Sequence, residues 1–203
     1  MSAPTRRPPR ADLLAALETR RSVAAAGLSE PGPSSDELRR LLTIAARVPD
    51  HAMLVPWRFI LIEGDARAEI GALLAQAYRA GNPEMAPEKR EKFAGIMSRL
   101  FPAPLAVVVV SRPNRETMIP VVEQEMSAGA VCLNLLHGVE ALGFSGIWVT
   151  GWAATNEAAL RIIGISEGER VAGIVHIGTA KEPPMERPRP EVEALVTRWT
   201  KRD

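Results

Sequence analysis

The sequence contains a single cysteine, Cys132, among its 203 residues. One thiol cannot build an intrachain disulfide framework or a four-cysteine zinc site, so the fold must be held by packing. A chain of this length buries roughly 70% of its unfolded surface, which is enough for a stable core. The reducing cytoplasm is the simplest compartment for such a protein, and we expect it there.

Long apolar runs and an excess of one charge are also missing. The longest apolar stretch, residues 103–110, falls far short of the ~20 residues of a membrane-spanning helix. Basic residues number 25 and acidic residues 24, so we expect neither nucleic acid nor a membrane as a partner. Lysine is scarce, being confined to Lys89, Lys92, Lys181 and Lys201. The positive charge is therefore mostly arginine, whose planar guanidinium suits phosphate and carboxylate groups.

The familiar signatures of catalytic sites are absent as well. His51, His137 and His176 stand singly in the sequence, without the His-x-x-x-His spacing of a metal site. Neither a Gly-x-Ser-x-Gly motif nor a phosphate-binding loop motif occurs. The strand expected at 105–111 continues into Arg112, where a dinucleotide-binding fold would have a glycine-rich turn. The sequence thus offers no metal site and no conventional catalytic acid, base or nucleophile.

Apolar periodicity predicts a mixture of helices and strands in one folded domain. Residues 1–10 are rich in proline and arginine and predict a disordered tail, which leaves the domain to residues 11–203. There are too few β-α-β units for a doubly wound sheet, so we predict an α+β fold. The expected helices are 11–20, 34–48, 65–79, 88–100, 120–142 and 156–163, the last capped by Thr155 or Asn156. The expected strands are 57–62, 105–111, 146–149 and 171–177, with a loop at 22–33 and a final amphipathic segment at 192–199.

Three of these elements have a distinctive composition. The uninterrupted apolar strand at 105–111 is typical of a strand covered on both faces. The middle of the 120–142 helix has almost no polar face, so it must be buried at the centre of the monomer or against a second subunit. The charged helix at 88–100 is expected to lie on the surface or to form a lid.

One group of residues suits a phosphate. Arg20, Arg21 and Ser22 follow the first helix and combine two guanidinium groups with a hydroxyl and free backbone N–H groups. The structural alternative is that arginines at a helix C-terminus complement the helix dipole.

Two further groups could contact a ligand. The loop from Arg47 to Trp57 holds a cation, the imidazole of His51 and an indole just before a strand. Its structural alternative is a tight connection capped by an aspartate. The segment 148–152 ends a short strand, and Gly151 would let a planar ligand approach the backbone. Here the structural alternative is a pair of core tryptophans.

The order and contents of these groups resemble the nitroreductase family of FMN-dependent enzymes, in particular a short bacterial branch of it. The resemblance covers about residues 11–199, and five segments in sequence are more specific than any one of them. The matching segments are 20–22, 46–51, 56–59, 123–129 and 143–148.

The resemblance implies a three-layer α+β fold with a central mixed, mainly antiparallel sheet flanked by helices. It also implies an intertwined homodimer with FMN at the subunit interface and the 120–142 helix in the dimer core. The residues matching Arg20, Arg21 and Ser22 would hold the phosphate and ribityl chain of FMN.

Further flavin contacts are implied by the same resemblance. The residues matching Arg47 and His51 would touch the flavin, and the segment of Trp148, Val149 and Thr150 would pass along it.

The sequence departs from relatives at two positions. Relatives often carry an arginine where Val149 stands, and Arg198 is a candidate for supplying the missing cation near the phosphate. Relatives commonly have an amide where Val55 stands, and this apolar residue cannot hydrogen-bond flavin or substrate. The substrate is therefore open to being something other than a nitroaromatic.

The activity implied is an NAD(P)H-dependent reduction with a ping-pong mechanism. NADH or NADPH would give hydride to FMN, and a small acceptor such as a nitroaromatic, quinone or enone would then take the electrons. The flavin carries the redox chemistry, so no catalytic side chain is required. Two alternatives stay open: an FMN-binding storage or sensing module with little turnover, and a structural dimer without cofactor.

Overall fold

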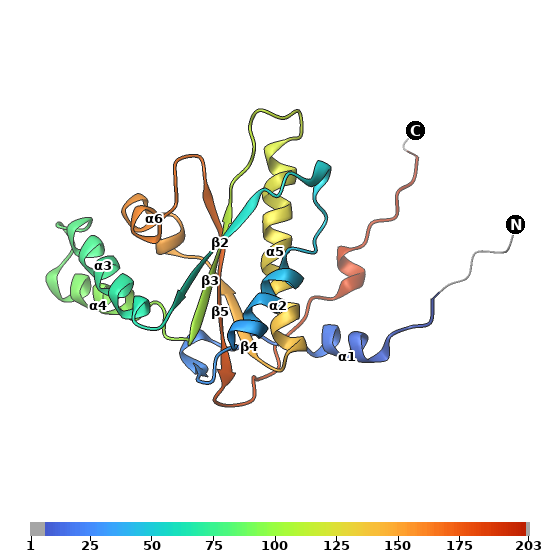
Figure 1. Ribbon diagram of the computed structural model, residues 1–203, viewed down its shortest axis with the longest axis horizontal. Coiled ribbons are helices and arrows are strands. Elements are labelled where there is room, and N and C mark those ends of the chain that lie inside the picture. Colours follow the sequence, from blue (N-terminus) through green and yellow to red (C-terminus); the bar gives the residue numbers. More distant parts are fainter. Residues whose placement is uncertain (1–6, 202–203) are drawn as a thin grey trace, which may run out of the picture.

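The computed structural model describes residues 7–201 and builds them around one antiparallel sheet with helices on both faces (Figure 1). The expected three-layer α+β fold is confirmed. Part of the expected N-terminal tail, residues 1–6, lies outside the described residues, and residues 7–10 are exposed. The helices are α1 (Ala11–Thr19), α2 (Ser35–Ala45), α3 (Ala66–Ala80), α4 (Pro87–Met97), α5 (Val121–Ala141) and α6 (Glu157–Ile163). The strands are β1 (Leu28–Ser29), β2 (Trp57–Glu63), β3 (Leu105–Ser111), β4 (Ser145–Val149) and β5 (Arg170–Ala180).

The longest strand, β5, organises the sheet. The strand order is β1-β5-β3-β2, and residues 174–177 of β5 pair with β3 on one edge and with β4 on the other. All pairings within the described chain are antiparallel, so the parallel member of the implied mixed sheet is not found there. Strand β1 lies within residues 22–33, where the sequence predicts a loop. The strand is not predicted because its two residues are too few to show an alternating pattern.

Two helices, α2 and α6, start at capping residues that the sequence indicates. At α2 the Ser34 hydroxyl accepts from Glu37 N–H at 3.4 Å, and the Glu37 carboxylate accepts from Ser34 N–H at 2.8 Å. At α6 the Asn156 side chain accepts from two backbone N–H groups, which selects Asn156 from the two predicted caps. Such side chains satisfy N–H groups that have no partner within the helix.

The sheet separates two halves of the hydrophobic core (Figure 1). Every residue of β3 is buried, as its composition predicts, and alternate residues face opposite sides. The α3-side core joins Ala106, Val108 and Val110 to helices α3, α4 and α6, whereas the α5-side core joins Leu105, Val107 and Val109 to helices α2 and α5.

The charged helix α4 is a surface layer. It packs against α3 through the buried residues Ala94 and Met97, and its Glu91 pairs with Arg79 of α3 at 3.0 Å. It lies on the face of the sheet opposite α5 (Figure 1). Helix α4 therefore lies on the surface and does not form a lid over residues near α5.

Helix α5 is buried on the sides that face the sheet and α2. Its outer side carries Val122, Met126 and Leu133 with exposed fractions of 57%, 62% and 45%, and a Cβ at Gly129 would meet nothing within 4 Å. We call these four residues the outer stripe of α5. A position at the centre of the monomer is thus excluded for the described chain. The sheet-facing side holds Cys132, which has no exposed surface, and burial raises the pKa of its thiol to about 12.

The C-terminal segment leaves the body of the molecule (Figure 1). The expected amphipathic segment 192–199 has only a short 3-10 turn, Val192–Leu195, and all of its side chains are exposed. Its apolar face contacts no core of its own chain. The apolar periodicity alone therefore does not extend the helix beyond this single turn. Nowhere in residues 7–201 is there a helix long and apolar enough to cross a membrane.

Candidate functional site

Arg20, Arg21 and Ser22 lie at the junction of α1 and the sheet. Helix α1 ends at Thr19, and the chain then runs extended to Val23, whose N–H donates to Gly146 O at 3.2 Å. This bond places the three residues beside the start of β4. Within the segment, the Arg20 guanidinium donates to the Ser22 hydroxyl at 3.5 Å.

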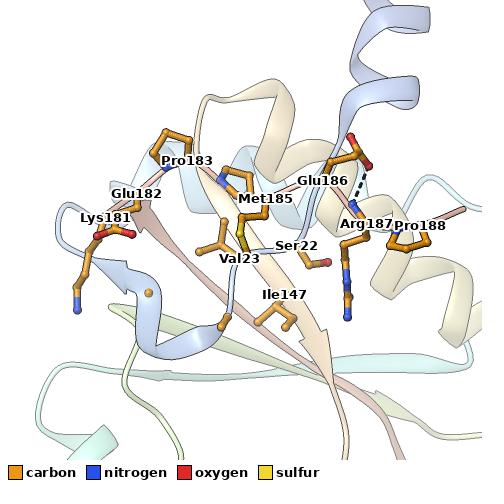
Figure 2. A pocket seen from close by; sticks show the side chains of 13 residues that line it. Ser22, Val23, Ile147, Lys181, Glu182, Pro183, Met185, Glu186, Arg187 and Pro188 are labelled. Carbon is orange, nitrogen blue, oxygen red and sulfur yellow. Dashed lines mark hydrogen bonds between the residues drawn. The ribbon is translucent and has the colours of Figure 1, made fainter.

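A hollow of about 730 Å³ opens beside Ser22, and its size falls within the range of about 300–1,000 Å³ usual for small-molecule sites. Figure 2 shows Ser22, Val23 and Ile147 on one side and the chain from Lys181 to Pro188 passing along the other. We call it the Ser22 hollow. Residues from the N-terminal third of the chain and from residues 181–188 thus line the same hollow.

Charged groups of both signs line this hollow. Lys181 and Arg187 are the positive ones, and Glu182 and Glu186 are the negative ones. The side chain of Arg21, which is outside this lining, is only 15% exposed. The carboxylate of Glu186 pairs with Arg21. It also accepts from the backbone N–H of Arg187 at 2.9 Å (Figure 2). The Arg21 guanidinium is therefore already paired with an anionic group of its own chain. Sequence reasoning missed Lys181 and Arg187, because their nearness to Ser22 arises only in the folded chain.

The C-terminal part of α5 lies close to the same group. The positive charge of Arg20 adds to the effect of burial, which is the larger cause, in lowering the pKa of His137. Cationic Arg20 therefore lies near the later turns of α5.

His51 lies toward the other end of α5, and Arg47 lies between His51 and the Arg20 end. The Asn134 side chain of α5 donates to Arg47 O at 3.3 Å. His51 Nδ1 lies 2.9 Å from the Glu123 carboxylate in the first turn of α5. The pair borders a second hollow of about 340 Å³ on the outer side of the helix, which we call the His51 hollow. Its lining residues are Pro49, His51, Glu123, Met126, Ser127 and Ala130.

The loop that carries His51 has a strained backbone. Ala52, Met53 and Val55 have φ angles of 57°, 53° and 48°, a region that L-residues other than Asn and Asp rarely adopt. The Asp50 carboxylate accepts from Leu54 N–H at 3.1 Å and from Val55 N–H at 2.9 Å, which holds the loop in this form. The capped tight connection is thus present, and strain of about 1–3 kcal/mol per residue is common near binding sites.

Trp148 and Trp152 differ in their surroundings. Trp152 packs edge-to-face on Tyr78 with ring centroids 5.2 Å apart, as a core tryptophan does. The Trp148 indole is 38% exposed and lies over Gly173, where a Cβ would overlap it. Its Nε1–H donates to Ala172 O at 3.3 Å. The indole is thus held against β5 just before the Val149–Thr150 segment.

The predicted site residues form two groups in a single chain. Arg20 lies near His137 and His51 lies against Glu123, and these two α5 positions are 14 residues apart, or ~21 Å along a helix. Arg198 is exposed in the C-terminal segment, and in residues 7–201 no hydrogen bond or ion pair joins it to Arg20, Arg21 or Ser22. The same range holds no cluster of three or more acidic, histidine or cysteine side chains able to hold a metal ion.

The fold is that of a three-layer α+β protein, and the Ser22 hollow lies beside its arginine-containing segment 20–22. The chain belongs to the nitroreductase family, whose model matches residues 17–179.

Individual relatives agree with this membership. The Escherichia coli K12 protein named "Putative NAD(P)H nitroreductase YdjA" is 34% identical over 83% of this chain and 88% of its own. A nitroreductase-like protein from Bacillus cereus shares the fold with a TM-score of 0.76, 24% identity and 97% coverage of both chains. A Bacteroides fragilis nitroreductase with bound FMN has a TM-score of 0.68 at 17% identity, over 93% of this chain and 98% of its own.

Proposed function

We propose that this protein is an FMN-dependent NAD(P)H oxidoreductase that reduces a small acceptor, such as a nitroaromatic, quinone or enone, by a ping-pong mechanism. The observation that carries the proposal is the Ser22 hollow, which Lys181 and Arg187 line together with Ser22, whose hydroxyl accepts from the Arg20 guanidinium. The name of the E. coli relative and the FMN of the B. fragilis structure support it.

The residues present fit FMN. Arg20, Arg21 and Ser22 would hold the phosphate and the ribityl chain, since the Arg21 guanidinium already pairs with a carboxylate of its own chain. The ring would lie along the Val149–Thr150 end of β4, next to the exposed face of Trp148. Bound flavin supplies the hydride chemistry. The protein's own part is to bind it, orient it and exclude water.

A second copy of the chain would complete the site. A two-fold axis through Gly129, at the middle of the outer stripe, would set two α5 helices side by side in opposite directions. The His51 end of one helix would then approach the Arg20 end of its partner, so that both groups of residues border one flavin. The exposed apolar side chains of residues 192–199 would then pack on the surface of the partner. Such an exchange of C-terminal segments would make the homodimer intertwined.

An absorbance spectrum before and after anaerobic addition of NADH or NADPH tests the proposal. The enzyme should be yellow and should lose its colour at about 450 nm on reduction, because the flavin carries the electrons. Flavin that stays oxidised would indicate a storage or sensing module, and a protein that takes up no added FMN would leave only a structural dimer.

Substitution of Arg20 by alanine separates binding from chemistry. Loss of a charged phosphate contact should weaken FMN binding roughly 10- to 100-fold and leave riboflavin binding unchanged, because riboflavin has no phosphate. Arg39→Ala is a matched control, since Arg39 is exposed and pairs only within α2. Full FMN occupancy in Arg20→Ala would contradict the assignment.

A further inference from the structure

His51 and Glu123 form a contact between two distant segments. The imidazole Nδ1 of His51 lies 2.9 Å from Glu123 Oε2, and both residues line the His51 hollow. Both side chains retain solvent exposure, at 65% and 43%. Exposed pairs of this kind add little to the free energy of unfolding. The contact therefore matters mainly for the position and orientation of the imidazole.

Both partners are held by rigid supports. On one side, Asp50 fixes the strained loop through the N–H groups of Leu54 and Val55. On the other side, Gln124 is 2% exposed and its amide bonds Asn114 at 2.8 and 2.9 Å, which anchors the first turn of α5. The contact therefore joins two segments that have little freedom to adjust.

The contact also selects one form of the imidazole. An ionised carboxylate only accepts hydrogen bonds, so the proton of a neutral His51 ring must lie on Nδ1. Nitrogen Nε2 is then left as an acceptor, because the bond at one ring nitrogen fixes the role of the other.

We propose that Glu123 is a positioning residue, which holds His51 so that Nε2 accepts a hydrogen bond from a ring N–H or a ribityl hydroxyl of the bound flavin. This inference rests on the proposed function. It assigns recognition of the ring and ribityl end of the cofactor to the Glu123–His51 pair, separately from recognition of the phosphate by Arg20 and Arg21.

The tautomer of His51 can be measured without cofactor. Nitrogen-15 NMR of the neutral ring should show His51 protonated on Nδ1. Glu123→Leu removes the acceptor and should shift the ring toward the Nε2–H form that free imidazole prefers. Glu123→Gln keeps an oxygen acceptor and should retain the native form. An Nε2–H ring in the unaltered protein would overturn the inference.

Flavin titrations test the consequence. Glu123→Leu should weaken FMN and riboflavin binding together by about fivefold, the effect of one neutral hydrogen bond, and Glu123→Gln should restore both to within about twofold. Glu125→Leu is the matched control, because Glu125 is two residues away and lies 3.7 Å from Arg170. If Glu123→Leu matches this control, the pair has no positioning role. If the unaltered protein binds no flavin, the proposed function itself fails, whereas the NMR result still reports on the contact.

Discussion

The two faces of the sheet differ in how completely they are covered. On the α3 side, three helices enclose the core, and one predicted flavin residue, Val149, packs against it. On the α5 side, two helices cover the sheet and the outer stripe of α5 stays exposed. Arg20, Arg47 and His51 all lie beside this incomplete side. Under the proposed function the two faces would differ in role: the enclosed face mainly holds the fold together, and the incompletely covered face would receive the ligand and the partner.

The largest expected effect comes from Gly129, where the outer stripe has no side chain. Gly129→Trp should split the proposed dimer and weaken FMN binding roughly a hundredfold or more, since bulk at the centre of an interface is poorly tolerated. Sedimentation velocity with FMN titration measures both effects. The same substitution on the other face, Gly95→Trp, should leave the dimer intact because only the flexible end of Arg99 lies near that Cβ. If Gly129→Trp stayed dimeric and kept its FMN, the outer stripe of α5 would not be the dimer interface.

Leu74→Ala should show the opposite pattern. Leu74 is fully buried in the α3-side core, and a cavity there should lower the free energy of unfolding by about 2–5 kcal/mol. FMN affinity of the folded protein should not change. Urea unfolding and flavin titration at low temperature provide the two measurements. A selective loss of flavin in this variant would show that the two faces are coupled.

His176 should make the α3 side sensitive to acid. It is 1% exposed, its Nδ1 has no hydrogen-bond partner and its ring packs against Phe101. Burial lowers its pKa to about 4. The unfolded chain therefore binds a proton first as the pH falls, so stability is complete above about pH 6.5 and declines toward pH 4, by about 3 kcal/mol in total.

Urea unfolding of His176→Met isolates this contribution. Between about pH 7 and pH 4.5 the variant should lose less stability than the unaltered protein, because it carries no buried imidazole. Equal losses in both proteins would assign the acid sensitivity to other groups.

The smallest expected effect is a gain in binding. The Glu186 carboxylate pairs with Arg21 and would compete with the FMN phosphate for it. Glu186→Gln removes this negative charge and should tighten FMN binding by about threefold, as expected for a partly exposed ion pair. Riboflavin binding should stay the same. Glu182→Gln, which alters the other acidic residue of the Ser22 hollow, should leave both affinities unchanged. Weaker FMN binding in Glu186→Gln would give the Arg21 pair a structural role.

Local signals in the sequence predict much of the fold. The apolar run at 105–111, the Ser34 and Glu37 capping box and the Asn156 cap each depend on neighbouring residues, and the structure confirms them. Strand β1 was missed because two residues have no period.

The assembly of the site depends on contacts between distant segments. The sequence indicates Arg20 and His51 but cannot show that ~21 Å of helix separates their positions. It also gives no sign that Lys181 lies beside Ser22. Positive φ at Val55 was equally hidden, since a β-branched residue predicts an extended backbone.

The single sulfhydryl described above has a practical consequence. Cys132 stays protonated and sealed from solvent, so alkylating reagents and peroxide should not reach it while the protein is folded. A cysteine introduced at fully exposed Met118 would then be the only reactive site for a spin label. The spacing between two such labels could be recorded in solution, against an otherwise silent background.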